Sequence, residues 1–418
     1  MPNVEVPSRA VQTLGVVQGD LITGDFATIR GEGTPPKVTV TGTVNCHGDC
    51  LFECSLSAEN LVGDGYIVVK GDLEIKNHVK MSDGFGLHWG PHAKAELNVE
   101  GNMQAETVDV DSKLSVGKDF EVKDVDVGGR LEVRGKTKAQ TIDVGGSFSA
   151  EGEVEAQSID VGGSVHIESK VKIEKLDVGG SAKVAGGRVN EIDVGGSFAS
   201  KDSLEFNSID VGGAVRLAGN NMGGDIDVGG VCKVEGDLQF GDIDVGGVVH
   251  ISGSGKGKSI DAGGVVKVGG SLELDGKIDV GGKVDVGGDL TAYDLDVGGS
   301  ARAKSITATT DVDVGGSIAT ALGTSASRVK IGRRGEVAGN IRADEVLIEG
   351  RAQVEDIYAK TIRMEERSRA RNLYGENISI ESDCQITGEV LYTGDLRTER
   401  NVYFAKPPQK VGKLPQQR

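Results

Sequence analysis

Aspartates that recur at a fixed spacing are the residues of this chain with the clearest capacity for chemistry. They stand in the tetrapeptide Asp-Val-Gly-Gly, which begins at Asp126 and recurs, mostly every 17 residues, as far as Asp313. We name as candidates for a cation-binding ladder Asp143, Asp160, Asp177, Asp210, Asp227 and Asp244. Such a row could bind Ca²⁺ or a cationic partner surface. Alternatively, each Asp could accept hydrogen bonds from the Gly-Gly amides at a corner of the chain.

Thiols and an imidazole form a second group near the N-terminal end. Cys46, His47, Cys50 and Cys54 supply the ligand types that hold Zn²⁺ in a tetrahedral site. The spacing is not a double Cys-x-x-Cys, so a turn would have to gather these side chains around one ion. The alternative is that the thiols are buried in an irregular cap. Downstream, His88-Trp89-Gly-Pro-His92 reads as an exposed loop and a candidate partner contact.

The elements that must position these residues are short strands. Between Ile159 and Val178, apolar residues occur in alternating pairs whose starts are 6, 6 and 5 residues apart. Alternation indicates a strand with one buried face, and the three spacings together span one repeat. Gly162-Gly163 would turn the corner after the first strand by adopting positive φ. The sequence therefore predicts an all-β fold, a single-stranded parallel β-helix (solenoid) with three short strands per coil of about 17 residues.

The same solenoid places two outward rows beside each other. Stacked aspartates would lie about 4.8 Å apart and repel by about 0.9 kcal/mol per neighbour in water. Around the next corner the outward residues are mostly basic or titratable: His166, Lys183, Ala199, Arg216, Lys233, His250 and Lys267. Such rows would serve lateral pairing of molecules or simply balance charge within one chain.

Composition changes along the chain and predicts five segments. The outer segments lack the repeat and contain prolines, whereas the third contains all the Asp-Val-Gly-Gly copies. The predicted segments are a flexible N-terminal tail (1–35), irregular N-terminal capping coils (36–108), the Asp-Val-Gly-Gly solenoid (109–318), C-terminal solenoid coils (319–405) and a flexible C-terminal tail (406–418).

Charge and motif content exclude several function classes. The 46 Lys and Arg against 64 Asp and Glu give a net charge of −18, which argues against binding nucleic acid or an anionic membrane. No apolar stretch reaches spanning length and no signal pattern opens the chain, so we expect a cytoplasmic protein. The sequence contains no Ser-His-Asp ordering, phosphate-binding loop or dinucleotide fingerprint, so we expect no enzyme.

The C-terminal third resembles the bactofilins. The resemblance lies in Gly335-Glu-Val-Ala-Gly-Asn-Ile, Ala343-Asp-Glu-Val-Leu-Ile-Glu-Gly, Gly388-Glu-Val-Leu and the short tail around Lys406-Pro-Pro. It implies a cytoskeletal β-helix that polymerises end to end without nucleotide, in a chain unusually long for that family. Its partners would be further copies of itself, with adaptor or cargo proteins on the tails.

The polymer contact would lie on the last coil, where we place Tyr403 and Phe404. The alternative function is a Ca²⁺- or partner-binding adhesive solenoid that uses the Asp row.

Overall fold

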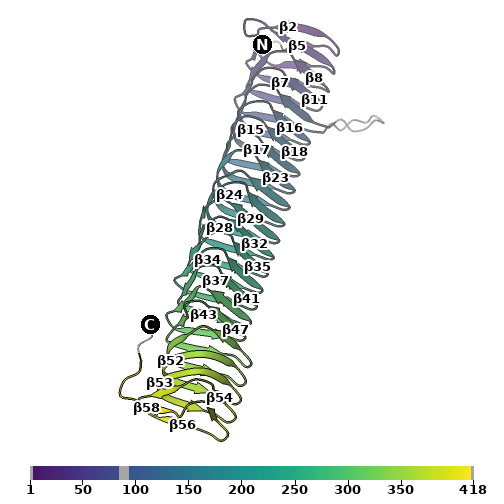
Figure 1. Ribbon diagram of the computed structural model, residues 1–418. Helices are drawn as coiled ribbons and strands as arrows, with labels where there is room; N and C mark the ends of the chain where they lie inside the picture. Colours follow the sequence, from purple (N-terminus) through teal and green to yellow (C-terminus); the bar gives the residue numbers. More distant parts are fainter. Residues whose placement is uncertain (1–2, 84–93, 416–418) are drawn as a thin grey trace. The chain divides into compact units, whose positions relative to one another are not determined.

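The computed structural model describes residues 3–83 and 94–415, and every regular element in these ranges is a β-strand (Figure 1). None of the described residues forms a helix of the length and hydrophobicity needed to cross a membrane. The chain divides into two compact units, Met1–Gly212 and Gly213–Arg418. Together they contain about 23 turns of a parallel β-solenoid with a spacing of roughly 17 residues, which confirms the predicted fold class.

The first unit contains strands β1 to β28. Their bounds are β1 (Val4–Val6), β2 (Val11–Leu14), β3 (Val16–Val17), β4 (Leu21–Thr23), β5 (Ala27–Gly31), β6 (Lys37–Val40), β7 (Thr43–Cys46), β8 (Cys50–Phe52), β9 (Ser55–Ala58), β10 (Asn60–Gly63), β11 (Tyr66–Val69), β12 (Leu73–Ile75), β13 (His78–Met81), β14 (Glu96–Val99), β15 (Met103–Val110), β16 (Lys113–Val116), β17 (Phe120–Val127), β18 (Arg130–Val133), β19 (Thr137–Lys138), β20 (Thr141–Val144), β21 (Ser147–Ala150), β22 (Val154–Val161), β23 (Ser164–Ile167), β24 (Lys170–Val178), β25 (Ser181–Val184), β26 (Gly186–Val194), β27 (Ser197–Ser200) and β28 (Leu204–Val211).

The second unit contains strands β29 to β58. Their bounds are β29 (Ala214–Ala218), β30 (Asn221–Met222), β31 (Asp225–Val228), β32 (Val231–Glu235), β33 (Leu238–Gln239), β34 (Asp242–Val245), β35 (Val248–Ile251), β36 (Gly255–Gly257), β37 (Ser259–Ala262), β38 (Val265–Val268), β39 (Leu272–Leu274), β40 (Lys277–Val280), β41 (Lys283–Val286), β42 (Asp289–Ala292), β43 (Asp294–Val297), β44 (Ser300–Ala303), β45 (Ser305–Ala308), β46 (Asp311–Val314), β47 (Ser317–Thr320), β48 (Thr324–Ser325), β49 (Arg328–Ile331), β50 (Glu336–Ala338), β51 (Ile341–Ile348), β52 (Gln353–Met364), β53 (Arg369–Ile380), β54 (Gln385–Ile386), β55 (Val390–Tyr392), β56 (Leu396–Thr398), β57 (Tyr403–Phe404) and β58 (Gln409–Lys410).

Within each unit the core is a column of aliphatic side chains. In β22, Ile159 and Val161 are fully buried, whereas Asp160 between them is exposed. The next coil places Leu176 over Ile159 in parallel register. Because successive side chains of a strand point to opposite faces, every coil buries the same alternate positions and stacks them on its neighbours.

The paired glycines turn the corners for a different reason than predicted. The φ of Gly162 lies outside the left-handed region, so the expected positive φ is wrong at this corner. A Cβ on Gly162 would instead lie 2.5 Å from the carbonyl oxygen of Gly145 in the preceding coil. Glycine is needed here because successive corners approach too closely for any side chain to fit between them.

The N-terminal segment is folded rather than a flexible tail. Residues 4–31 form β1 to β5, and β1 pairs in parallel with β4. The prediction for residues 1–35 failed because this region lacks the tetrapeptide and its coils differ in length. Val4 pairs with Leu21, and Leu21 pairs with Val44, so the second of these coils is the longer one. Residues 36–83 and 94–108 likewise continue as stacked coils, and the candidate partner contact at His88–His92 lies outside the described ranges.

The C-terminal coils have wider corners and longer strands. The two glycines after Val314 are replaced, after Ile331, by the four-residue turn Gly332–Gly335. Arg334 in that turn, and Arg351 and Arg367 in the next two coils, adopt left-handed φ of 62–69°. The tail predicted at 406–418 is partly ordered as well, because β58 pairs with β55.

Candidate functional site

The Asp ladder of the first unit is longer than the tetrapeptide alone predicted. Asp109 lies in register with Asp126 although Gly-Gly does not follow it. The signal that could have found Asp109 is the shared Val-Asp-Val, 17 residues before the Val-Asp-Val at Asp126. The register then continues, one aspartate per coil, through Asp143, Asp160, Asp177, Asp193 and Asp210.

The second unit carries its own ladder, which ends at a lysine. Its members, in register, are Asp227, Asp244, Asp261, Asp279, Asp296 and Asp313. In the following coil Lys330 takes the same register position, and its Nζ lies 3.0 Å from an Asp313 carboxylate oxygen. The sequence thus stops the run of like charges with a side chain of opposite sign.

Two aspartates of the ladders, Asp160 and Asp296, have raised pKa values. Partial burial raises the pKa of Asp160, and the neighbouring carboxylates of Asp177 and Asp143 raise it further. The pKa of Asp296 is raised for the same reasons, with Asp279 and Asp313 as the neighbours. Each ladder therefore costs folding free energy at neutral pH, because the folded state holds carboxylates near one another that the unfolded chain keeps apart.

Backbone hydrogen bonds between coils use glycine amides that would otherwise donate to the Asp side chains at the corners. The amide of Gly162, which follows Asp160-Val161, donates to the Val144 carbonyl of the preceding coil at 3.0 Å. The Gly145 amide donates in the same way to Val127. At these corners the amide of the first glycine therefore belongs to the inter-coil ladder and is not a donor for the Asp side chain.

The predicted metal ligands do not converge. Cys46, Cys50 and Cys54 are buried, whereas His47 is exposed on the outer surface. Within residues 3–83 and 94–415, no group of three or more His, Cys, Asp or Glu side chains could hold a metal ion, on the Asp ladders or at the thiols. Alternation sends the three thiols inward and the imidazole outward, so His47 does not share a site with the cysteines.

The pKa values of Cys46 and Cys54 are raised, whereas the hydrogen bond with Cys46 lowers the pKa of Cys50. A hydrogen bond shared with Cys50, together with desolvation, raises the pKa of Cys46 well above its usual range. Burial raises the pKa of Cys54 to about 11. Cys232 is fully buried, and burial raises its pKa to about 12. Thiolates are the metal-binding and nucleophilic form, so the cysteines with raised pKa values act as small core residues.

The row beside the Asp ladder is only partly basic. In the first unit it contains His166 and Lys183, followed by Ala199. In the second unit it runs Arg216, Lys233, His250, Lys267, Asp285 and Arg302. Asp285 begins a copy of the tetrapeptide, yet the structure places it in this row and not in the ladder. Lys233 and Lys283 pair with Glu235 and Asp285 at 2.6 and 3.0 Å, so charge is balanced within the chain.

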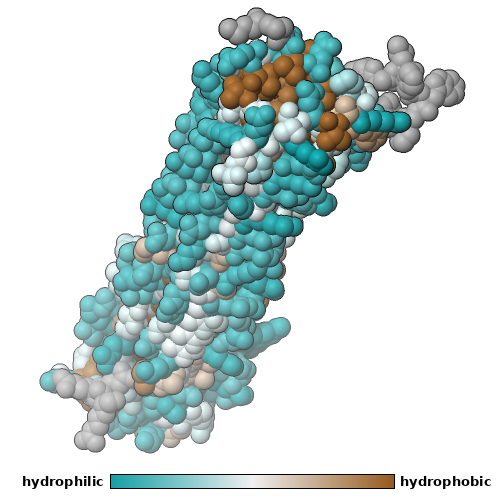
Figure 2. All heavy atoms as spheres, turned by 90° about the horizontal axis from the view of Figure 1, so that it is seen from above, coloured by the Kyte–Doolittle hydropathy of each residue, from teal (hydrophilic) through white to brown (hydrophobic). Residues whose placement is uncertain are grey.

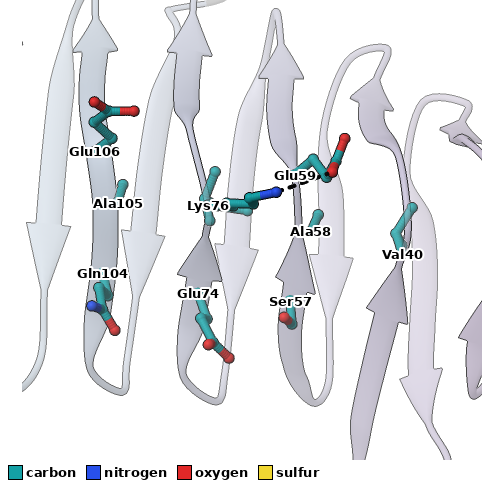
Figure 3. Close-up of a pocket in the computed structure, with 10 residues that line it drawn as sticks. Val40, Ser57, Ala58, Glu59, Glu74, Lys76, Gln104, Ala105 and Glu106 are labelled. Atoms are coloured by element: carbon teal, nitrogen blue, oxygen red, sulfur yellow. Dashed lines mark ion pairs between the residues drawn. The ribbon is translucent and has the colours of Figure 1, made fainter.

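A shallow groove lies on the face of the first unit that is formed by β6, β9, β12 and β15 (Figure 3). Its floor is apolar, with Val40, Ala58, Ile75 and Ala105 in successive coils, and Glu74 and Gln104 stand at its side. Lys76 forms an ion pair with Glu59 at 3.6 Å across the edge. The charged groups of this groove sit on exposed rims, so it lacks the enclosed polar constellation on which catalysis depends.

The N-terminal end of the first unit is an unpaired, apolar edge. Each strand of the first coil has one partner strand among the described residues: β1 pairs with β4, β2 with β5 and β3 with β6. Val11 and Val16 on this coil and Phe26 on the next are exposed, Val16 by 66%. Figure 2, which looks onto this end, shows apolar side chains gathered there. Sequence reasoning missed this surface because it assigned residues 1–35 to a tail.

Among the described residues, the C-terminal coil of the second unit also pairs on one side only. The last coil consists of β56, β57 and β58, which pair with β53, β54 and β55. Tyr403 and Phe404, the predicted polymer-contact residues, form β57. Tyr403 is exposed and Phe404 half-buried, so this coil presents an aromatic side chain beside free backbone hydrogen-bonding groups.

Comparison with known proteins gives one family. Residues 295–391 match the family model for bactofilins, described as polymer-forming cytoskeletal. The matched region begins inside the Asp-Val-Gly-Gly repeats and ends on β55. No curated protein and no solved structure matches the chain.

Proposed function

We propose that this chain, a β-solenoid that carries a bactofilin domain, assembles into filaments by end-to-end stacking of its coils. The observation that carries the proposal is the apolar, unpaired edge of the first coil. A parallel edge offers unsatisfied N–H and C=O groups to any strand of matching spacing, and natural proteins usually protect such edges with charge or proline. On this coil Val11 and Val16 are exposed in β2 and β3, whereas Pro7 and Arg9 lie at the corner before β2, so burying these two strands against another coil is favourable.

The energetics of such a contact come from the backbone and from apolar burial. Stacking one coil end on another continues three ladders of hydrogen bonds without any bound cofactor. Apolar area buried at the contact adds about 25 cal/mol per Å². No step of this assembly requires nucleotide hydrolysis, so we infer nucleotide-independent filaments and a structural role rather than an enzymatic one.

Location and further partners belong to the same proposal. We infer that the protein acts in the cytoplasm, where its filaments would serve as a scaffold. Adaptor or cargo proteins would bind through the terminal segments of the chain. The exposed Asp ladders would face solvent along the filament, where their charge limits nonspecific association.

Two charge substitutions at the ends test the proposal. Val16→Glu and Phe404→Glu each place a carboxylate on an end face, and we expect either to abolish long filaments in negative-stain images while thermal unfolding stays near wild type. Leu322→Glu is the matched control, because Leu322 is 65% exposed but lies outside both terminal coils. Filaments of wild-type length in both end variants would overturn end-to-end stacking. Filaments that appear only when nucleotide is added would overturn nucleotide independence.

A further inference from the structure

The chain does not end at the last coil but turns back along the second unit (Figure 1). After β58 the Val411 amide donates to the Tyr392 carbonyl at 2.8 Å. The following residues bring Leu414 and Pro415 to a groove over the strands of the three preceding coils, where Tyr358 and Tyr374 also line the wall.

Two stacked tyrosines form the centre of this groove. Tyr358 on β52 lies in register with Tyr374 on β53, and their ring centroids are 4.6 Å apart with planes inclined by 21°. The Tyr374 hydroxyl donates to a Glu389 carboxylate oxygen at 2.7 Å, which fixes the orientation of its ring. Tyr374 is nearly fully buried, whereas the Tyr358 ring remains half-exposed toward the groove.

The walls of the groove are polar and of both signs. Arg342 and Asp344 lie on β51, and Lys360 on β52 pairs with Asp344 at 2.7 Å. Glu376 on β53 lines the other side. An aromatic floor between charged walls suits a ligand with an apolar strip and a solvated backbone, such as an extended peptide.

Leucine followed by proline matches this surface. Proline rings pack flat on aromatic faces, and the fixed φ of proline lowers the entropy lost when an extended segment binds. The tail also carries Lys410 and Lys413, whose charge is opposite to that of Asp344 and Glu376 in the groove.

We propose that the groove over the Tyr358–Tyr374 stack is a binding site for extended leucine-proline segments, and that residues 411–415 of the same chain occupy it. The site is thereby masked by an intramolecular ligand, held close by the pairing of β58 with β55. A tethered segment acts at an effective concentration of about a millimolar. A free peptide of the same sequence therefore competes poorly until the tail is released.

Binding of a labelled peptide tests this directly. The probe is a fluorescein-labelled peptide with the sequence of residues 406–418, and the readout is its fluorescence anisotropy with the full chain. We expect weak binding to wild type and at least about tenfold tighter binding to the full-length Leu414→Asp variant, whose own tail no longer docks. Adding Tyr358→Ala to Leu414→Asp should weaken peptide binding by about tenfold or more.

Two matched variants separate recognition from loss of fold. Tyr358→Phe keeps the ring face and should preserve peptide binding in the Leu414→Asp background. Tyr293→Ala removes an exposed tyrosine of the same unit away from the groove and should leave the affinity unchanged.

Three results would overturn the proposal. They are equal binding by wild type and Leu414→Asp, no binding by Leu414→Asp, and indifference to Tyr358→Ala. The compared quantity is the affinity of the peptide per chain, obtained from the anisotropy titration. This comparison between variants does not require that filaments form.

Discussion

At the scale of single residues, the Asp-Val-Gly-Gly repeat divides into parts with different physical costs. Val fills the core and Gly permits close approach of successive corners, so both contribute to stability. Asp does neither. At Asp160 the side chain is exposed, and partial burial together with the carboxylates of Asp177 and Asp143 raises its pKa. A residue that recurs in almost every coil of the repeat despite this cost is expected to act at the surface rather than in folding.

Replacing one ladder aspartate should therefore stabilise the fold in a pH-dependent way. The pKa of Asp160 is higher in the folded chain, so its contribution to stability is full below the unfolded pKa of about 3.9 and is lost as pH rises through the folded pKa. We expect Asp160→Asn to raise the free energy of unfolding at pH 7 by up to about 1 kcal/mol at low salt. The gain should vanish near pH 3.5, where the wild-type carboxyl is also neutral.

Asp242 supplies a control of opposite sign for this experiment. Hydrogen bonds from Lys258 and Ser259 lower the pKa of Asp242, so its contribution to stability is present above the unfolded pKa and lost as pH falls. Asp242→Asn should destabilise the chain at pH 7. Denaturant unfolding across pH 3.5–7 measures both variants, and a destabilising Asp160→Asn at pH 7 would contradict the electrostatic account of the ladder.

At the scale of elements, the corners distinguish the repeat region from the C-terminal coils. Gly-Gly corners leave no room for side chains, whereas the four-residue corners after Ile331 project arginines outward. Arg334, Arg351 and Arg367 each adopt left-handed φ, which disfavours a residue with a Cβ. The region matched by the bactofilin model contains these corners and also the long strands β51, β52 and β53 that support the Tyr358–Tyr374 groove.

The corner conformation makes a prediction at Arg351. Its φ is 69°, and glycine adopts this conformation without steric cost, so Arg351→Gly should raise the free energy of unfolding by about 0.5–1 kcal/mol. Arg351→Val should lower it, because a β-branched side chain tolerates left-handed φ worst. Urea unfolding of both variants provides the measurement. A destabilising glycine would show that the Arg351 side chain makes contacts that outweigh the backbone cost.

At the scale of the whole molecule, electrostatic repulsion between copies opposes the apolar attraction between their terminal coils. The chain carries a net charge of −18, so copies repel, whereas the exposed valines of the first coil and the aromatic residues of the last favour burial. Salt screens the first effect and leaves the second largely unchanged, because apolar burial is not an ionic interaction.

Assembly should consequently be promoted by salt. We expect the critical concentration for sedimentable filaments to fall by several fold between 20 and 150 mM NaCl, as the Debye length shortens from about 20 to about 8 Å. CaCl₂ and MgCl₂ at equal concentration should act alike, and EDTA should have no effect. A response to Ca²⁺ far stronger than to Mg²⁺ would instead support the calcium-binding function of the Asp ladders.

The sequence by itself determined the coil, the inward valines and the outward Asp row, because alternation within strands and a fixed repeat are local properties. It also indicated the bactofilin resemblance from short phrases such as Gly388-Glu-Val-Leu. Only the tertiary structure decided which residues meet across coils. It folded residues 4–31 into the edge that we propose for polymerisation, separated His47 from the buried thiols and moved Asp285 out of the ladder. It also brought Leu414 onto Tyr358 and Tyr374. The physical reason is that register between coils depends on the number of residues at every corner, and uneven corners carry no repeated motif from which that number could be read.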